Sequence, residues 1–384
     1  MNAEVLGRVR RRLVDSGTSP QRPALAAMVR ENAGGLTGHS QVLGLVREAE
    51  WELAGAGPLE PLLRQPETTD VLVNAPDSVW VDQGSGLRRV PLRFPDEAAV
   101  RGLAQRLAAL AGRRLDDASP WVDAALPDGT RLHAVLPPVA VGGTCLSLRT
   151  FRAKGFSVDE LARAGTLPRG AAGLVDATVR ARVAFLVSGG TGSGKTTLLG
   201  AMLGVVDATE RLVLVEDAAE LRTAHPHVVR LTARPPNVEG AGEVSLRDLV
   251  RQALRMRPDR LVVGEVRGAE VVELLTALNT GHAGSAGTLH ANSARELPAR
   301  LEALGALGHL ERHALHSQAA AALQVALHLA RFADGRRVLT ELAVFRRQGE
   351  RVHVVPAWRH DDGPLDGWPD LADLLQLRRT GREP

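Results

Sequence analysis

The feature that most constrains this 384-residue chain is one glycine-rich segment between an apolar run and a helix-favouring run. The segment reads GGTGSGKTT over residues 189–197, with VAFLVS before it and LLGAML after it. Glycines let several backbone N–H groups turn toward one point, and the N-terminus of a following helix adds partial positive charge there. The segment therefore predicts a strand, a phosphate-binding loop and a helix in that order.

Two residues of the loop carry specific chemistry. Lys195 is placed to reach the β and γ phosphates of a nucleotide, and the hydroxyl of Thr196 is a ligand for Mg²⁺. The nucleotide-binding residues that we expect are Gly189, Gly190, Thr191, Gly192, Ser193, Gly194, Lys195, Thr196 and Thr197.

Composition makes Lys195 stand out. Of the 47 lysines and arginines, only Lys154 and Lys195 are lysines. A GC-rich genome explains the bias toward arginine, but a phosphate loop needs a slim point charge that the planar guanidinium does not replace. The net charge of +3 gives no argument for nucleic-acid binding, and the absence of tyrosine leaves few platforms for base stacking.

The single cysteine, Cys145, excludes an intramolecular disulfide and a zinc site of four cysteines. No stretch approaches the 18 apolar residues of a membrane span. The basic residues 1–12 are not followed by an apolar segment with a small-residue cleavage site. We therefore expect a cytoplasmic protein.

Periodicity predicts an α/β fold. Apolar residues recur at helical spacing over residues 5–13 and 42–53. From residue 158 strands and helices alternate, which is typical of a mostly parallel sheet covered on both faces. The expected parts are an N-terminal helical segment (1–56), a small α/β domain (57–150), a linker (151–157), a nucleotide-binding domain (158–350) and a C-terminal tail (351–384).

Two strand ends supply carboxylates for chemistry on a phosphate. Glu216 and Asp217 follow the strand RLVLV, and Glu265 follows RLVVG. The carboxyl ends of neighbouring parallel strands meet at one edge of a sheet. We expect Glu216 to orient the attacking water and Glu265 to hold Mg²⁺ through a coordinated water. The sequence does not separate Glu216 from Asp217 as the base.

Two histidines lie in the run TGHAGSAGTLHANS, which is rich in small residues. The spacing between His282 and His290 is not that of a zinc site. We interpret both as sensors that touch the γ phosphate or its attacking water. The alternative is that each is an ordinary core or surface histidine.

Four motifs occur in the order GGTGSGKTT, VEDAAEL, LRMRPDRLVVGEVRGAE and TGHAGSAGTLHANS. Together they resemble the secretion ATPases of type II and type IV systems, above all the Tad (tight adherence, or Cpa) pilus branch, over about residues 40–345. The resemblance implies a RecA-like C-terminal domain, ATP and Mg²⁺ as cofactors, and a homohexamer. It assigns a Walker A motif (189–196), an Asp box (216–221), a Walker B region (260–265) and a His box (282–290).

The resemblance also implies arginines that reach the nucleotide from the N-terminal domain. Arg131 in DGTRLHA and Arg149 in SLRTF hold the matching positions, with Arg152 as a further candidate. A guanidinium stabilises the charge that spreads over the phosphoryl oxygens during transfer. The catalytic residues that we expect are thus Glu216, Asp217, Glu265, His282, His290, Arg131 and Arg149.

The function that the resemblance implies is ATP hydrolysis that powers assembly or secretion of a Tad-type pilus. The protein would act at the cytoplasmic face of the membrane, on inner-membrane platform proteins and not on nucleic acid. The four-cysteine zinc module of type II secretion ATPases is excluded by the cysteine count. Two alternatives stay open, a conjugation-type DNA-transfer motor and a nucleotide-binding scaffold that does not hydrolyse ATP.

Overall fold

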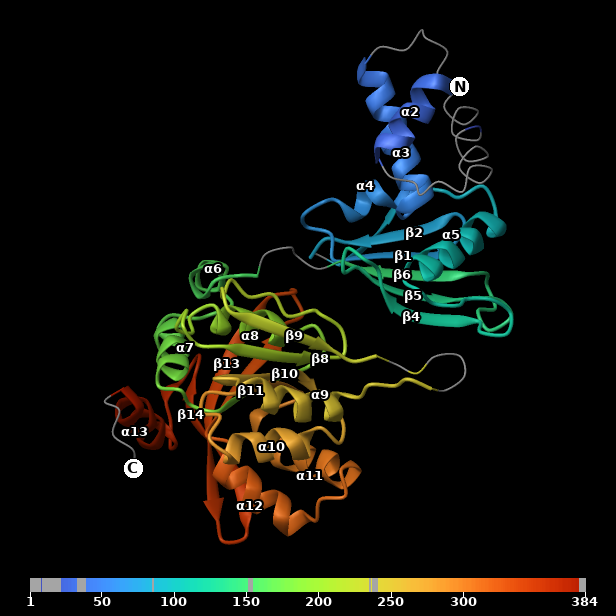
Figure 1. Ribbon diagram of the computed structural model, residues 1–384. Coiled ribbons are helices and arrows are strands. Elements are labelled where there is room, and N and C mark those ends of the chain that lie inside the picture. Colours follow the sequence, from blue (N-terminus) through green and yellow to red (C-terminus); the bar gives the residue numbers. More distant parts are fainter. Residues whose placement is uncertain are drawn as a thin grey trace. The chain divides into compact units, whose positions relative to one another are not determined.

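The structure is a computed structural model that describes residues 8, 22–32, 39–84, 86–150, 155–234, 236 and 241–379. The chain divides into two compact units, Met1–Phe151 and Arg152–Pro384 (Figure 1). Apart from Arg8, the helix expected over residues 5–13 lies outside the described residues, as do Arg152 and Lys154.

The first unit begins with a pair of helices that share a small core. Helix α2 (Arg22–Asn32) and helix α3 (His39–Ala54) bury Leu25, Val29 and Val46 against each other. Helix α3 confirms the helix expected over residues 42–53, and α2 also lies in the segment 1–56 that we expect to be helical. The short helices η1 (Gly57–Leu59) and α4 (Glu60–Leu63) lead from this pair into the sheet.

The rest of the first unit is a six-stranded antiparallel sheet in the order β3-β2-β1-β6-β5-β4. Helix α5 (Glu97–Leu110) packs on this sheet, and its Val100, Leu103 and Leu107 are buried in the same core as the apolar residues of the strands. Asp96 caps this helix by accepting a hydrogen bond from the Ala99 N–H at 2.8 Å. The strands are β1 (Asp70–Ala75), β2 (Ser78–Asp82), β3 (Leu87–Val90), β4 (Trp121–Ala125), β5 (Arg131–Val135) and β6 (Cys145–Arg149).

The second unit is built on a nine-stranded sheet in the order β15-β14-β13-β12-β7-β11-β10-β8-β9. The strands from β12 to β9 in this order are parallel, and β13, β14 and β15 are antiparallel. Its strands are β7 (Phe185–Gly189), β8 (Leu212–Glu216), β9 (Val228–Thr232), β10 (Arg260–Val266), β11 (Ala286–His290), β12 (Val325–Arg331), β13 (Arg337–Gln348), β14 (Arg351–Arg359) and β15 (Gly363–Pro364).

Helices cover both faces of this sheet (Figure 1). Successive residues of a strand point to opposite faces, and along β7 Phe185 and Val187 enter one core while Leu186 enters the other. The parallel sheet covered on both faces is therefore confirmed. One core contains α6 (Val158–Arg163), α7 (Ala171–Arg180), α8 (Lys195–Leu203) and α13 (Trp368–Arg379), and the other contains α9 (Leu246–Ala253), α10 (Val271–Asn279), α11 (Leu297–Leu307) and α12 (Arg312–Ala322). The short helices η2 (Leu254–Met256) and η3 (Ala294–Glu296) complete the unit.

The expectation of a C-terminal tail over residues 351–384, loose from about Asp361, is wrong for the residues that the structure describes. Strand β14 pairs with β13 along its length, and α13 buries Leu371 and Leu375 in the core. An ion pair from Arg346 to Asp370, at 2.7 Å, ties the helix to the sheet. Leucines at positions 371, 374 and 375 have helical spacing that the nearby turn residues obscured. Among the described helices, none is long and apolar enough to cross a membrane.

Candidate active site

The glycine-rich segment forms the connection between β7 and α8. Strand β7 is buried at every position. Gly189, Gly192 and Gly194 adopt φ values of 148°, 69° and 97°, a region that favours glycine. A Cβ at Gly189 would overlap the carbonyl oxygen of Leu329 on the neighbouring strand β12. Glycine is thus required both by the turn of the loop and by the close passage of β12.

Lys195 is the first residue of α8, and its side chain points into the mouth of the loop. The residue is 7% exposed. Its Nζ donates to the carbonyl oxygens of Gly189 at 3.1 Å and Gly190 at 3.0 Å. Burial lowers the pKa of Lys195, and the negative charge of Glu265 opposes that shift. The loop therefore holds one cation at the point where phosphate oxygens would bind.

His290 connects this lysine to Glu265. The His290 Nε2 lies 2.8 Å from Glu265 Oε1, and its Nδ1 lies 3.3 Å from Lys195 Nζ. Burial lowers the pKa of His290, as does the charge of Lys195, while Glu265 opposes both. Lys195 Nζ also lies 3.4 Å from Nε2, so the ammonium is close to both ring nitrogens. A neutral ring fits the contact with Glu265 if Nε2 donates to the carboxylate. Lys195, His290 and Glu265 thus form a continuous polar chain at the loop.

Glu216 ends β8 and is 4% exposed. Its Oε1 accepts from the backbone N–H groups of Glu220, at 3.1 Å, and Leu221, at 2.7 Å. Its Oε2 lies 3.6 Å from an Arg230 nitrogen. Burial raises the pKa of Glu216 to about 7, although these partners oppose the shift. This carboxylate consequently holds the Asp-box loop in place and ionises close to neutral pH.

Asp217 has a different environment from its neighbour. It forms an ion pair with Arg267, the second residue after Glu265.

Thr196 lies half-buried in the first turn of α8, and Thr197 and Thr191 are exposed. The structure therefore brings the expected loop residues, Glu216, Asp217, Glu265 and His290 to the same edge of the parallel sheet, because each lies at or beyond the carboxyl end of its strand.

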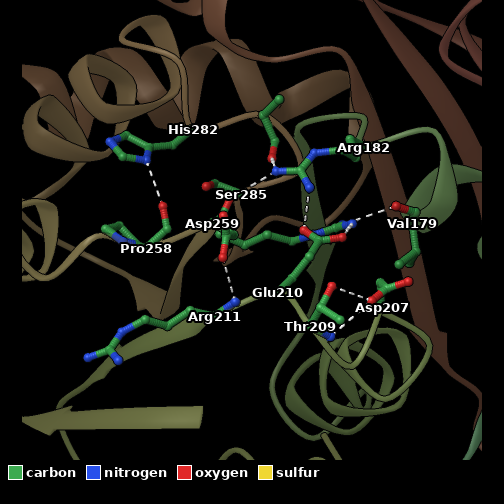
Figure 2. Close-up of polar contacts among 12 residues, drawn as sticks. Val179, Arg182, Asp207, Thr209, Glu210, Arg211, Pro258, Asp259, His282 and Ser285 are labelled. Carbon is green, nitrogen blue, oxygen red and sulfur yellow. Dashed lines mark hydrogen bonds and ion pairs between the residues drawn. The ribbon is translucent and has the colours of Figure 1, made fainter. Parts of the chain in front are cut away.

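The structure does not bring His282 to the phosphate loop. His282 precedes β11 and its Nδ1 lies 3.2 Å from the carbonyl oxygen of Pro258, which precedes β10 (Figure 2). His290 ends β11, so the two histidines are at opposite ends of a strand of five residues, about 16 Å long. The expectation that both histidines touch the phosphate fails for His282, because strand β11 runs between the two residues and His282 precedes the end of the strand that lies away from the loop.

A buried ion-pair cluster occupies the end of the sheet where His282 lies. Arg260 is 2% exposed and donates to both carboxylate oxygens of Glu210 at 2.9 Å. It also donates to the carbonyl oxygen of Val179 at 3.0 Å. Arg182 pairs with the same Glu210 and reaches the carbonyl oxygens of Asp259 and Ala283. The cluster ties together the amino ends of the central strands, away from the phosphate loop.

The two arginines expected from the first unit lie side by side within that unit. Arg131 on β5 and Arg149 on β6 are directly paired across the sheet. Arg131 forms an ion pair with Asp123 at 3.0 Å, and Arg149 with Asp70 at 3.0 Å. Both guanidinium groups thus have acidic partners in their own unit.

Several residues at the site were not expected from the sequence. Arg230 faces Glu216, Arg267 pairs with Asp217, and His328 Nδ1 lies 3.0 Å from the Oγ of Ser188, just before the loop. Only Arg267 had a local signal, because it lies two residues after Glu265 in the chain. Arg230 and His328 reach the site through strand pairing that no short motif records.

These features define a RecA-like α/β protein with a phosphate loop at the carboxyl ends of its parallel strands. The chain belongs to the type II/IV secretion system protein family, whose model matches residues 52–353. A putative conjugal transfer protein of Mycobacterium tuberculosis is 62% identical over 351 residues, which cover 90% of this chain and 100% of that protein.

Two solved structures share the fold. The ATPase DotB of Legionella pneumophila has a TM-score of 0.55 at 19% identity, over 84% of this chain and 85% of that chain. The pilus retraction motor PilT, solved with bound ADP, has a TM-score of 0.54 at 22% identity, over 84% of this chain and 85% of that chain. At these identities the likeness establishes the fold alone.

Proposed function

We propose that this protein is a homohexameric ATPase that hydrolyses ATP to power assembly or secretion of a Tad-type pilus at the cytoplasmic face of the membrane. The observation that carries the proposal is the polar chain from Lys195 through His290 to Glu265 at the mouth of the phosphate loop. A ligand for the phosphates, a neutral histidine and a carboxylate for Mg²⁺ stand together there. Membership of the secretion family and the ADP bound to PilT support the same proposal.

The residues of the loop would bind ATP in three ways. Backbone N–H groups of residues 190–194 and the N-terminus of α8 would hold the phosphate oxygens. Lys195 would exchange its bonds to the Gly189 and Gly190 carbonyls for bonds to the β and γ phosphates. The Thr196 hydroxyl would ligate Mg²⁺, and Glu265 would hold the ion through a coordinated water, with His290 fixing the carboxylate.

Glu216 is the residue that we propose as the water-orienting base. A pKa of about 7 is near that of an effective general base at neutral pH. Asp217 is the less suitable candidate, because its ion pair with Arg267 stabilises the ionised form. Arg131 and Arg149 are proposed to add positive charge during hydrolysis, as the resemblance to secretion ATPases implies.

The cellular role can be tested by complementation. A strain that lacks the gene is complemented with the wild-type chain or with Lys195→Ala, and surface pili are counted by electron microscopy. The proposal expects pili with the wild-type chain and none with Lys195→Ala at equal protein level. Normal piliation of the deletion strain would contradict the Tad role. A mass of six chains in the presence of ADP and Mg²⁺ would support the hexamer, and a monomer under those conditions would contradict it.

A DNA-transfer motor is the second candidate, favoured by the name of the Mycobacterium tuberculosis relative. Net charge of +3 and the lack of tyrosine weigh against it. Fluorescence anisotropy with single- and double-stranded DNA decides between the two. Binding at about micromolar concentration that weakens steeply with salt would favour the DNA motor. Binding of ATP without release of phosphate would instead favour a scaffold.

A further inference from the structure

Two arginines outside the four motifs lie at the end of a β-hairpin next to the phosphate loop. Arg331 ends β12, Arg337 begins β13, and the two residues are directly paired across the ladder. Strand β12 runs parallel to β7 with Leu329 opposite Gly189. Since β7 ends at Gly189, the continuation of β12 carries Arg331 alongside the loop.

Both side chains occupy space that glycine leaves open. The Arg337 Nε donates to the carbonyl oxygen of Gly192 at 3.0 Å. Its Cδ lies 3.6 Å from the position that a Cβ would take at Gly194. The NH1 of Arg331 lies 3.2 Å from the position that a Cβ would take at Gly192. The hairpin arginine pair, Arg331 and Arg337, is therefore packed against the loop itself.

The bond from Arg337 fixes the direction of one loop amide. A trans peptide plane directs its C=O and its N–H to opposite sides. Holding the Gly192 carbonyl toward Arg337 consequently turns the Ser193 N–H the other way, back into the loop. That N–H donates to the Gly190 carbonyl oxygen on the inner side of the turn, with 3.4 Å between nitrogen and oxygen. An anion nest requires inward N–H groups of this kind.

The charges of the pair are not balanced by carboxylates. Like charges directly opposite each other in a ladder destabilise it. Among the ion pairs of the described part of the chain, neither Arg331 nor Arg337 has an acidic partner within 4.0 Å. Arg336, between them on the same hairpin, differs because it pairs with Asp334 at 2.6 Å. A bound polyphosphate would relieve the repulsion within the pair.

We propose that the hairpin arginine pair raises the affinity of the phosphate loop for the polyphosphate of a nucleotide. Arg337 is a positioning residue, which acts through the Gly192 carbonyl, and Arg331 supplies positive charge beside the loop. The inference rests on the proposed function, because it needs a nucleotide at this loop. The hairpin arginine pair would add two positive charges from the second unit to the charge of Lys195 in the phosphate loop.

The test is titration calorimetry of the full chain with ADP and Mg²⁺. Arg337→Met and Arg331→Met keep the aliphatic stem and remove the charge. Each is expected to weaken ADP binding by about tenfold, the size of one lost charge-assisted hydrogen bond or ion contact. Arg337→Lys, which keeps a cationic donor, should recover most of the affinity. Arg336→Met is the matched control and should bind ADP as the wild type does.

Two further readouts separate this role from a merely structural one. In ATP turnover the Met variants should raise KM by about tenfold and leave kcat within about twofold. Without nucleotide, Arg331→Met should unfold at a slightly higher temperature than the wild type, because repulsion in the pair is gone, yet gain less from added ADP. If both Met variants bind ADP as tightly as the wild type, or if Arg336→Met loses as much affinity as they do, the inference about the pair is wrong. The proposed function would not be affected by either result. A wild-type chain that does not bind ADP would overturn the proposed function as well.

Discussion

His290 Nε2 lies 2.8 Å from Glu265 Oε1, which joins the last residue of β11 to the carboxylate at the end of β10. Lys195 Nζ lies 3.3 Å from Nδ1 and 3.4 Å from Nε2 of the same ring. A change in how Lys195 engages the phosphates would therefore reach the proposed Mg²⁺ carboxylate through one side chain. This relationship separates His290 from the other histidine of the motif.

The first prediction compares those two histidines. His290→Ala should reduce ATP turnover by about 10²-fold, because it breaks the connection between Lys195 and Glu265. His282→Ala should leave turnover within about threefold and instead lower thermal stability, since it removes a contact to Pro258 at the other end of the sheet. Steady-state phosphate release and thermal unfolding measure both. Equal loss of turnover in the two variants would contradict the assignment.

The second prediction concerns the pH dependence of stability. Burial raises the pKa of Glu216 from its ordinary value of 4.5 to about 7, so the folded state keeps a proton that the unfolded chain has lost. The contribution of Glu216 to stability is thus fully present below pH 4.5 and falls as pH rises toward 7. Glu216→Gln mimics the protonated form. Its stability relative to wild type should grow across this window by up to about 3 kcal/mol.

Hydrogen exchange of strands β7 and β8 at several pH values measures this difference within the second unit. Asp176→Asn is a suitable control, because Asp176 is exposed and pairs with Arg180 on the surface of α7. A difference between Glu216→Gln and wild type that does not change with pH would show that the carboxyl ionises normally.

The third prediction concerns the buried pair of Arg260 and Glu210. Arg260→Met leaves the Glu210 carboxylate without its bidentate partner and should cost about 3–5 kcal/mol of unfolding free energy. Arg180→Met, which breaks the exposed pair with Asp176, should leave the free energy of unfolding almost unchanged. Denaturant unfolding compares the two. The double variant Arg260→Met with Glu210→Gln should lose less than the sum of its single variants.

The fourth prediction compares two helical glycines. A Cβ at Gly200 on α8 would overlap the carbonyl oxygen of Arg222, whereas a Cβ at Gly173 on α7 would meet nothing within 4 Å. Gly200→Ala should therefore destabilise the second unit by about 1–3 kcal/mol. It should also weaken nucleotide binding, because α8 begins at Lys195. Gly173→Ala should stabilise the protein by up to about 1 kcal/mol. Thermal unfolding without ADP shows whether Gly200→Ala lowers the stability and Gly173→Ala raises it. The same measurement with ADP shows whether Gly200→Ala gains less stability from the nucleotide.

Local pattern was sufficient to predict much of the site. The phosphate loop, Lys195, Glu216 and Glu265 follow from strand, loop and helix signals within a few residues of each other. Their convergence follows from the rule that parallel strands end at one edge. The α/β fold with a parallel sheet follows from the same alternation of strands and helices.

Long-range pairing and segment boundaries were not predictable in this way. Arg337 reaches the loop only because β12 pairs with β7 and β13 returns beside it. His282 was misplaced because the small residues of TGHAGSAGTLH do not show where its strand begins, and β11 puts the two histidines at its opposite ends. Helix α13 was missed because the turn at residues 361–364 resembles the start of a loose end.

The central claim, that Lys195 serves ATP hydrolysis at this loop, is tested most directly by phosphate release from the full chain with ATP and Mg²⁺. Lys195→Ala should reduce the rate to background, because no arginine nearby can replace a point charge held inside the loop. Lys154→Ala, which changes the only other lysine, should leave the rate unchanged. Undiminished phosphate release by Lys195→Ala would contradict the account.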